Sequence, residues 1–86
     1  MPEVCRFLSI IIKMYYDDHP PPHFHAEYQG SKAMFSIATG KKIKGQFPKK
    51  QEVLVNAWAL LRKKELLKAW ESVVSEQEPK KIAPLE

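Results

Sequence analysis

The histidines of this chain are gathered into one short segment. They are His19, His23 and His25. Consecutive prolines at residues 20–22 stiffen the link between the first histidine and the other two, because each proline ring fixes φ and removes a backbone donor. Carboxylates flank the cluster, with Asp18 before it and Glu27 after it. Imidazoles and carboxylates bind transition metals and move protons near neutral pH, so this segment is the first candidate for a chemical site.

Three interpretations fit the histidine segment. In the first it is a metal site: His23 and His25 share one face of a strand and converge on one ion, while His19 arrives from the proline loop. Asp18 or Glu27 would complete a four-coordinate shell for zinc or another divalent transition metal. In the second, His23 or His25 is a catalytic general acid–base, its tautomer fixed by a neighbouring carboxylate. In the third, the side chains bond local backbone groups and have a structural role.

A block of lysines forms a second candidate site. It consists of Lys41, Lys42, Lys44, Lys49 and Lys50, and residues 41–50 contain no acidic residue. Lys49 and Lys50 fall in the first turn of an expected helix, whose free N–H groups and dipole attract anions. The block would therefore suit a phosphate or a nucleic-acid backbone. The alternative is a solvated edge strand and helix end, since lysines on an edge also discourage association between sheets.

The residues around both candidate sites indicate strands in the first half of the chain. Residues 4–16 are rich in Val, Ile, Phe and Tyr and lack Gly and Pro, which predicts one long strand. Alternation predicts a second strand over residues 23–29. Turns at Gly-containing pairs separate it from a third strand over residues 32–38 and from a basic edge strand over residues 41–47. These segments predict a small antiparallel sheet of three to four strands.

The alternation in residues 23–29 also fixes which side chains share a face. Phe24 and Tyr28 point toward the expected core, whereas His23, His25 and Glu27 point the opposite way. The candidate metal ligands of this strand therefore lie together, away from the apolar side chains.

The second half of the chain is typical of helix. Pro48 suits the start of a helical region over residues 48–77, because its missing N–H is not needed there. Lys64 and Glu65 interrupt the apolar stripe, which leaves either one bent helix or two helices that meet near residues 62–64, and we expect a break there. An extended tail over residues 78–86 follows.

Together these elements predict an α+β fold in a single domain over residues 1–86, with strands in residues 4–47 and the helical region packed on one face of the sheet. One core is expected to hold the large apolar side chains of both halves. They are Ile10, Ile12, Phe24, Tyr28, Trp58, Leu61 and Trp70. Ile82 and Leu85 are expected to pin the tail to this core.

The composition is that of a globular protein rather than a disordered or membrane-spanning one. Of the 86 residues, 44% are hydrophobic and 28% are charged, with a formal net charge of +4. The longest apolar run, residues 7–12, ends at Lys13 and is far too short to cross a bilayer. The single cysteine, Cys5, cannot form an internal disulfide and is expected to be buried. We therefore expect a cytoplasmic protein without membrane partners.

Residues 14–19 (MYYDDH) and residues 21–28 (PPHFHAEY) resemble the central motif of a small bacterial family, domain of unknown function 4160. The Trp58-Ala59 helix and the closing segment over residues 81–85 are similar to that family as well. The resemblance implies no activity, because members of the family have none established. Genes of the family often lie beside a gene for another small protein, in pairs suggested to be toxin–antitoxin modules. The resemblance thus implies a small protein partner encoded nearby.

The sequence leaves an enzyme and a non-enzymatic protein both open. The first hypothesis is a non-enzymatic binding component of a two-gene module, which docks a protein partner through its open sheet face or its helical side. The alternative is a His-dependent RNA-binding protein or ribonuclease, since the order of elements is similar in outline to that of HicA-type toxins. Nucleic acid is then a candidate partner. A metal-binding protein that uses His19, His23 and His25 is a further alternative.

Overall fold

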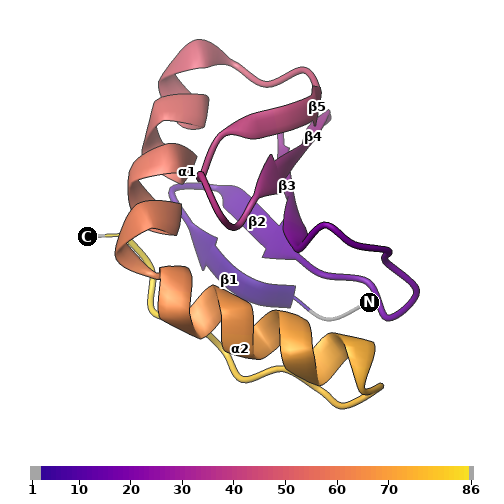
Figure 1. The fold of residues 1–86 in the computed structure, drawn as a ribbon. Helices are drawn as coiled ribbons and strands as arrows, with labels where there is room; N and C mark the ends of the chain where they lie inside the picture. Colours follow the sequence, from indigo (N-terminus) through magenta and orange to yellow (C-terminus); the bar gives the residue numbers. More distant parts are fainter. Residues whose placement is uncertain (1–2, 86) are drawn as a thin grey trace.

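The computed structural model describes residues 3–85 and has a five-stranded antiparallel sheet followed by two helices (Figure 1). The elements are β1 (Glu3–Phe7), β2 (Ile10–Lys13), β3 (His23–Tyr28), β4 (Ser31–Ser36), β5 (Lys42–Gly45), α1 (Lys49–Leu61) and α2 (Lys63–Val74). The strands follow one another across the sheet in the order β1-β2-β3-β4-β5. The predicted α+β class is confirmed, and the sheet has one strand more than the largest number expected.

The extra strand arises because the predicted long strand over residues 4–16 is wrong. A tight turn at Leu8 and Ser9 folds this segment into a hairpin in which Phe7 pairs with Ile10. Both turn residues have positive φ, 49° and 65°, which is the geometry of a two-residue hairpin turn. Such turns usually contain Gly, Asn or Asp, so the sequence carries no signal for this one. Leu8, counted in the strand, lies in the turn and is 63% exposed.

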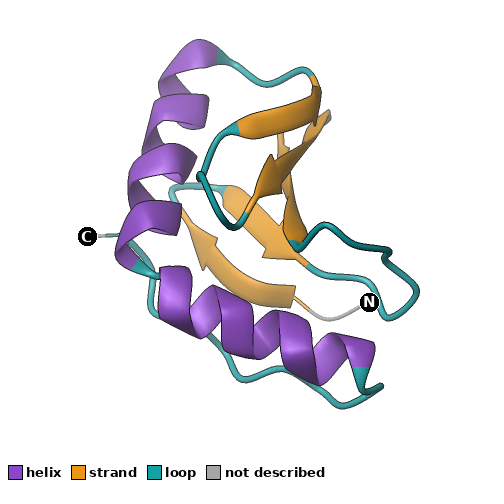
Figure 2. Cartoon of the chain, in the orientation of Figure 1, coloured by secondary structure: helices purple, strands orange, loops and turns teal. Residues whose placement is uncertain are grey.

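The helices pack on one face of the sheet and enclose a single core. Trp58 of α1 is fully buried and meets Phe24 edge-on, with ring centroids 5.7 Å apart. Phe24 in turn stacks on Phe35 of the neighbouring strand. The indole N–H of Trp58 donates to the carbonyl of Ala83 at 2.8 Å, and Ile82 is buried, so the tail is pinned to the core as predicted. Figure 2 shows this tail as a loop segment that returns past the junction of the two helices.

The predicted break between two helices is confirmed. α1 ends at Leu61 and α2 begins at Lys63, with Arg62 between them at φ −110° and ψ 23°, outside helical geometry. α2 ends at Val74, before the expected end of the helical region at residue 77. Among residues 3–85, no helix is long and apolar enough to cross a membrane.

The core assignment holds for most residues and fails for one. Ile10, Ile12, Phe24, Trp58 and Trp70 are buried, and Tyr28 packs against the core from its border. Leu61 is 68% exposed, so its assignment to the core is wrong. The buried residues of α1 are Val55, Trp58 and Ala59. Apolar residues occur on both sides of this helix, so spacing alone could not choose the buried face.

Candidate metal centre

The site is formed where β3 begins and where the loop after β2 turns back toward it. His23 and His25 occupy the first and third positions of β3, and they face the same side of the sheet. Asp18 belongs to the loop. Its backbone N–H donates to the carbonyl of Tyr15 at 3.2 Å, and its Oδ2 accepts from the backbone N–H of Tyr15 at 3.1 Å. This reciprocal pair closes a small turn that points the Asp18 carboxylate at the two imidazoles.

Three potential ligand atoms converge in this site. The Nε2 atom of His25 lies 3.3 Å from Oδ1 and 3.1 Å from Oδ2 of Asp18. The Nε2 atom of His23 lies 3.5 Å from Oδ1 of Asp18. One ligand atom from each of the three residues lies within 4.8 Å of the other two. The carboxylate thus stands between two imidazole nitrogens that approach it from the same strand.

His23 is the most constrained member of the cluster. The residue is 4% exposed, and its Nδ1 lies 2.8 Å from the carbonyl oxygen of Pro21. A carbonyl only accepts, so the hydrogen-bond network assigns the proton to Nδ1. In the neutral ring Nε2 then carries a lone pair. This Nε2 is buried and has no hydrogen-bond partner within the described residues.

Burial also shapes the chemistry of His25. Desolvation lowers the pKa of His25, while the charge of Asp18 and its hydrogen bond act in the opposite direction. Burial is the larger effect, so the ring is neutral at neutral pH, and a neutral imidazole is the form that ligates a metal.

Aromatic side chains hold the two imidazoles in place. The ring of Tyr15 meets His25 edge-on with centroids 4.4 Å apart, and Trp70 of α2 lies 5.2 Å from the ring of His23. Neither aromatic residue could be assigned to the site from the sequence, because Trp70 comes from a helix far along the chain. Tyr15 follows the end of β2, where strand alternation no longer tells which way a side chain points.

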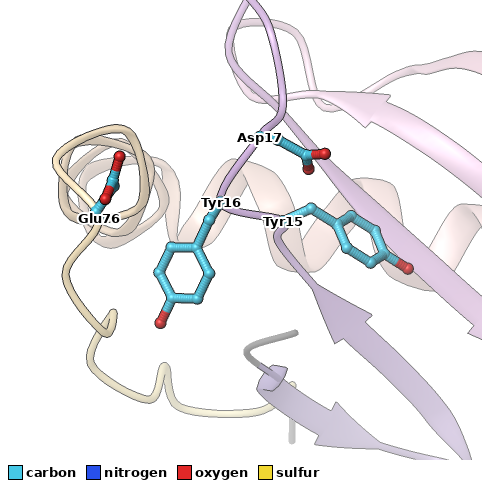
Figure 3. Close-up of a pocket in the computed structure, with 4 residues that line it drawn as sticks. All are labelled: Tyr15, Tyr16, Asp17 and Glu76. Carbon is cyan, nitrogen blue, oxygen red and sulfur yellow. The ribbon is translucent and has the colours of Figure 1, made fainter.

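A hollow of about 480 Å³ lies beside the Asp18 turn. It is lined by Tyr15, Tyr16, Asp17 and, beyond the end of α2, Glu76 (Figure 3). Figure 3 shows Tyr15 and Tyr16 pointing in different directions from adjacent positions of the loop. The site therefore lies near the surface, although the Nε2 atom of His23 is itself covered.

Two of the predicted ligands lie outside the cluster. Glu27 shares a face with His25, but it forms an ion pair with Lys13 across the strands at 3.2 Å. His19 is exposed and does not join the group of converging ligand atoms. The structure thus brings together Asp18, His23 and His25 from the five candidates.

The lysine block is spread over β5, the loop before it and the start of α1. Lys41 precedes β5, Lys42 and Lys44 belong to β5, and Lys49 and Lys50 begin α1. Lys42 forms an ion pair with Glu52 of α1 at 3.5 Å, whereas the other four lysines are exposed. The block therefore does not form one enclosed anion pocket.

The three donor groups suit a transition metal. Two imidazoles and one carboxylate are ligands that zinc and ferrous iron accept, and the Nδ1–H bond from His23 to a carbonyl is the outer contact that typically orients a ligating histidine.

Comparison with known proteins gives one match. No curated protein and no solved structure matches the chain. A family model matches residues 9–71, which include the whole of the Asp18, His23 and His25 cluster as well as most of the sheet and the helices. This match covers well over half of the chain, and the protein therefore belongs to the family described as Domain of unknown function (DUF4160).

Proposed function

We propose that this protein binds one divalent transition-metal ion, with zinc as the leading candidate, through Asp18, His23 and His25. The observation that carries the proposal is the buried Nε2 of His23, which lacks a hydrogen-bond partner among the described residues and faces Oδ1 of Asp18. Buried polar atoms are nearly always paired, so such an atom needs an explanation.

A cation between the ligand atoms supplies that explanation. An ionised carboxylate only accepts hydrogen bonds, so the lone pair of His23 Nε2 and the oxygens of Asp18 repel each other unless a positive charge lies between them. A proton would serve poorly, because 3.5 Å from Nε2 to Oδ1 is long for a charge-assisted hydrogen bond. A metal ion bonded to both atoms instead holds them about 3.3 Å apart, which is close to the observed separation.

The spacing of the ligand atoms agrees with a metal. In a tetrahedral site with bonds of about 2.0–2.1 Å, neighbouring ligand atoms lie about 3.3 Å apart. The two imidazole nitrogens are 3.3 Å and 3.5 Å from the same carboxylate oxygen, Oδ1 of Asp18. Without metal, the Nε2–H of His25 donates to Asp18, so metal binding would displace this proton.

Three protein ligands leave at least one coordination position for water or for a ligand from another molecule. Structural zinc sites are usually closed by four protein ligands, whereas sites with three take part in catalysis or bind an external group. A bound water would have a lowered pKa at such an ion.

Isothermal titration of protein purified without an affinity tag tests the proposal. We expect one equivalent of zinc to bind, His23→Ala and His25→Ala each to abolish this binding, and Asp18→Asn to weaken it. His19→Ala and Glu27→Gln are matched controls, because these residues lie outside the cluster, and both should bind normally. Wild-type protein that stays metal-free after incubation with zinc, nickel or manganese would overturn the proposal.

A second candidate function is that of a binding component of a two-gene module, which docks a small protein partner. The observation in its favour is a set of exposed apolar side chains on α1. The ribonuclease alternative has less support, because His23 is covered and its Nε2 cannot reach a bulky RNA phosphodiester without rearrangement.

A further inference from the structure

α1 carries a second apolar face that the rest of the described chain does not cover. Val53 is 53% exposed, Leu60 is 62% exposed and Leu61 is 68% exposed. Ala57 between them is exposed as well. At 3.6 residues per turn these four lie on one side of the helix, opposite the buried face that holds Trp58. We call Val53, Ala57, Leu60 and Leu61 the outer stripe of α1.

The outer stripe is unusual for a helix at the surface. A helix packed on a core normally has one apolar stripe and a polar opposite side, whereas a helix that is apolar on both sides is normally covered on both. Contiguous exposed apolar groups of this kind mark interaction sites more often than scattered single ones do. α2 follows the ordinary pattern more closely, since charged residues such as Lys68 and Glu71 dominate its exposed side.

The charges at both ends of the outer stripe are positive. Lys49 and Lys50 precede it at the start of α1, and Lys63 and Lys64 follow it at the start of α2. All four are exposed, and none forms an ion pair within residues 3–85.

The carboxylates nearest in sequence to these lysines are already engaged. Glu52 pairs with Lys42, and Glu65 pairs with Arg62. An occupant of the outer stripe therefore meets two uncompensated cationic ends.

These charges disfavour a second copy of the chain as the occupant. Antiparallel packing of two α1 helices would bring Lys49 and Lys50 of one copy against Lys63 and Lys64 of the other. Parallel packing would bring each pair against its own equivalent. Like charges would face each other in either arrangement, which opposes association. Nucleic acid is disfavoured too, because leucines offer its phosphates nothing and aliphatic side chains do not stack on bases as aromatic ones do.

We propose that the outer stripe of α1 binds an amphipathic helix of a different protein, whose apolar face is bordered by Asp or Glu at both ends. The stripe from Val53 to Leu61 spans about 12 Å, and the whole of α1, which begins at Lys49 and Lys50, offers a partner about three and a half turns of helix. Helix-on-helix docking would cover the leucines, and the acidic ends would pair with the lysines. This inference rests on the second candidate function and is independent of the metal site.

Three synthetic helical peptides of about 18 residues provide the test. They share one leucine stripe and differ only at their ends, which carry Glu, Gln or Lys. Binding to the full chain is measured by fluorescence anisotropy. We expect the Glu-ended peptide to bind about tenfold more tightly than the Gln-ended one, and the Lys-ended one to bind least. Replacing Lys49 and Lys50 with Gln should weaken binding of the Glu-ended peptide and make it less sensitive to salt.

Variants of the stripe supply the matched comparison. The double variant Leu60→Ser/Leu61→Ser should weaken binding of the Glu-ended peptide at least about tenfold, whereas Leu67→Ser on α2 should leave it unchanged. Leu67 is the control because it is also an exposed leucine, at 37%, but lies outside the stripe. Binding of the peptide should be the same with and without a metal chelator, which separates this test from that of the metal.

Each contrary outcome has a distinct meaning. Equal binding of the Glu-ended and Gln-ended peptides would retain the docking surface but overturn the acidic partner. Absence of binding, or unchanged binding in the Leu60→Ser/Leu61→Ser variant, would overturn the docking surface. Self-association in sedimentation that this variant abolishes would identify a second copy as the occupant and overturn the proposal. RNA binding that depends on the same leucines would overturn it as well.

Discussion

Two regions of the molecule break opposite rules of folding, by which buried polar atoms are hydrogen-bonded and apolar side chains are covered. They are the cluster of Asp18, His23 and His25 and the outer stripe of α1. The cluster buries a polar atom, Nε2 of His23, without a hydrogen-bond partner among the described residues. The stripe exposes leucines without covering them. A missing polar partner leaves room for a small ion, whereas missing apolar cover calls for a surface as large as a helix. An unpaired buried polar atom therefore indicates a small bound ion, whereas an uncovered apolar stripe indicates a bound protein surface.

The largest expected change in stability distinguishes the buried face of α1 from its outer stripe. Trp58→Ala should reduce the free energy of unfolding by about 3–5 kcal/mol, because the buried indole packs on two aromatic rings and its loss leaves a cavity. Leu61→Ser on the outer stripe should change it by no more than about 0.5 kcal/mol. Urea unfolding followed by circular dichroism measures both. Similar losses in the two variants would mean that the outer stripe is covered in solution.

The next largest effect is the stabilisation that zinc should give by binding at the cluster of Asp18, His23 and His25. Zinc at a hundred times its dissociation constant should raise the free energy of unfolding by about 2.7 kcal/mol, because it binds the folded chain only. The increase should vanish in His25→Ala and persist in Leu60→Ser. Thermal denaturation with and without zinc provides the measurement. An equal increase in His25→Ala would place the ion elsewhere.

A smaller change in stability is expected at the β1–β2 hairpin, where the unusual feature is the positive φ of Leu8 and Ser9. Replacing Leu8 with Asn and Ser9 with Gly should stabilise the protein by about 1 kcal/mol, because these residues tolerate positive φ better. Urea midpoints would show the gain. A loss of stability would indicate that Leu8 makes contacts in solution that its exposed position does not reveal.

The smallest expected effect is on the reactivity of Cys5. This thiol is buried in the hydrophobic core, so it can be compared with the buried imidazole of His23. Burial raises the pKa of the Cys5 thiol, so the folded state disfavours the thiolate. The neutral, buried thiol contributes to the stability of the folded state at pH values below the ordinary thiol pKa. This contribution is lost as the pH rises toward the raised pKa of Cys5. Alkylation by iodoacetamide should be slow in the native protein and fast in urea. Fast native alkylation would show that β1 opens readily.

Much of the fold follows from the sequence because periodicity and propensity agree there. β3 alternates strictly, and the helix break and the pinned tail were each indicated by local residues. The hairpin was missed because Leu8 and Ser9 adopt positive φ without the residues that normally announce it. Leu61 was misplaced because α1 is apolar on two sides.

The cluster was predictable only in part. His23 and His25 were paired by the spacing of a strand, which is a local property. Asp18 could be chosen over Glu27 only from the structure, because the fold of the loop returns the first carboxylate to the imidazoles while Lys13 engages the second. The Asp18 turn and the Lys13–Glu27 ion pair depend on particular side-chain contacts rather than on a repeating pattern, so they leave no periodic signal.

The tail has a consequence for how the protein is made. The backbone N–H of Ile82 donates to the carbonyl of Val4 at 2.7 Å, and the amine of Lys81 donates to that of Glu3. Both acceptors belong to β1, an outer strand of the sheet, whose unpaired groups are a template for aggregation. During synthesis β1 emerges well before Lys81 and Ile82, which cover it. The nascent chain therefore carries an open strand edge until Lys81 and Ile82 have been made, and slow translation of the intervening residues would prolong that exposure.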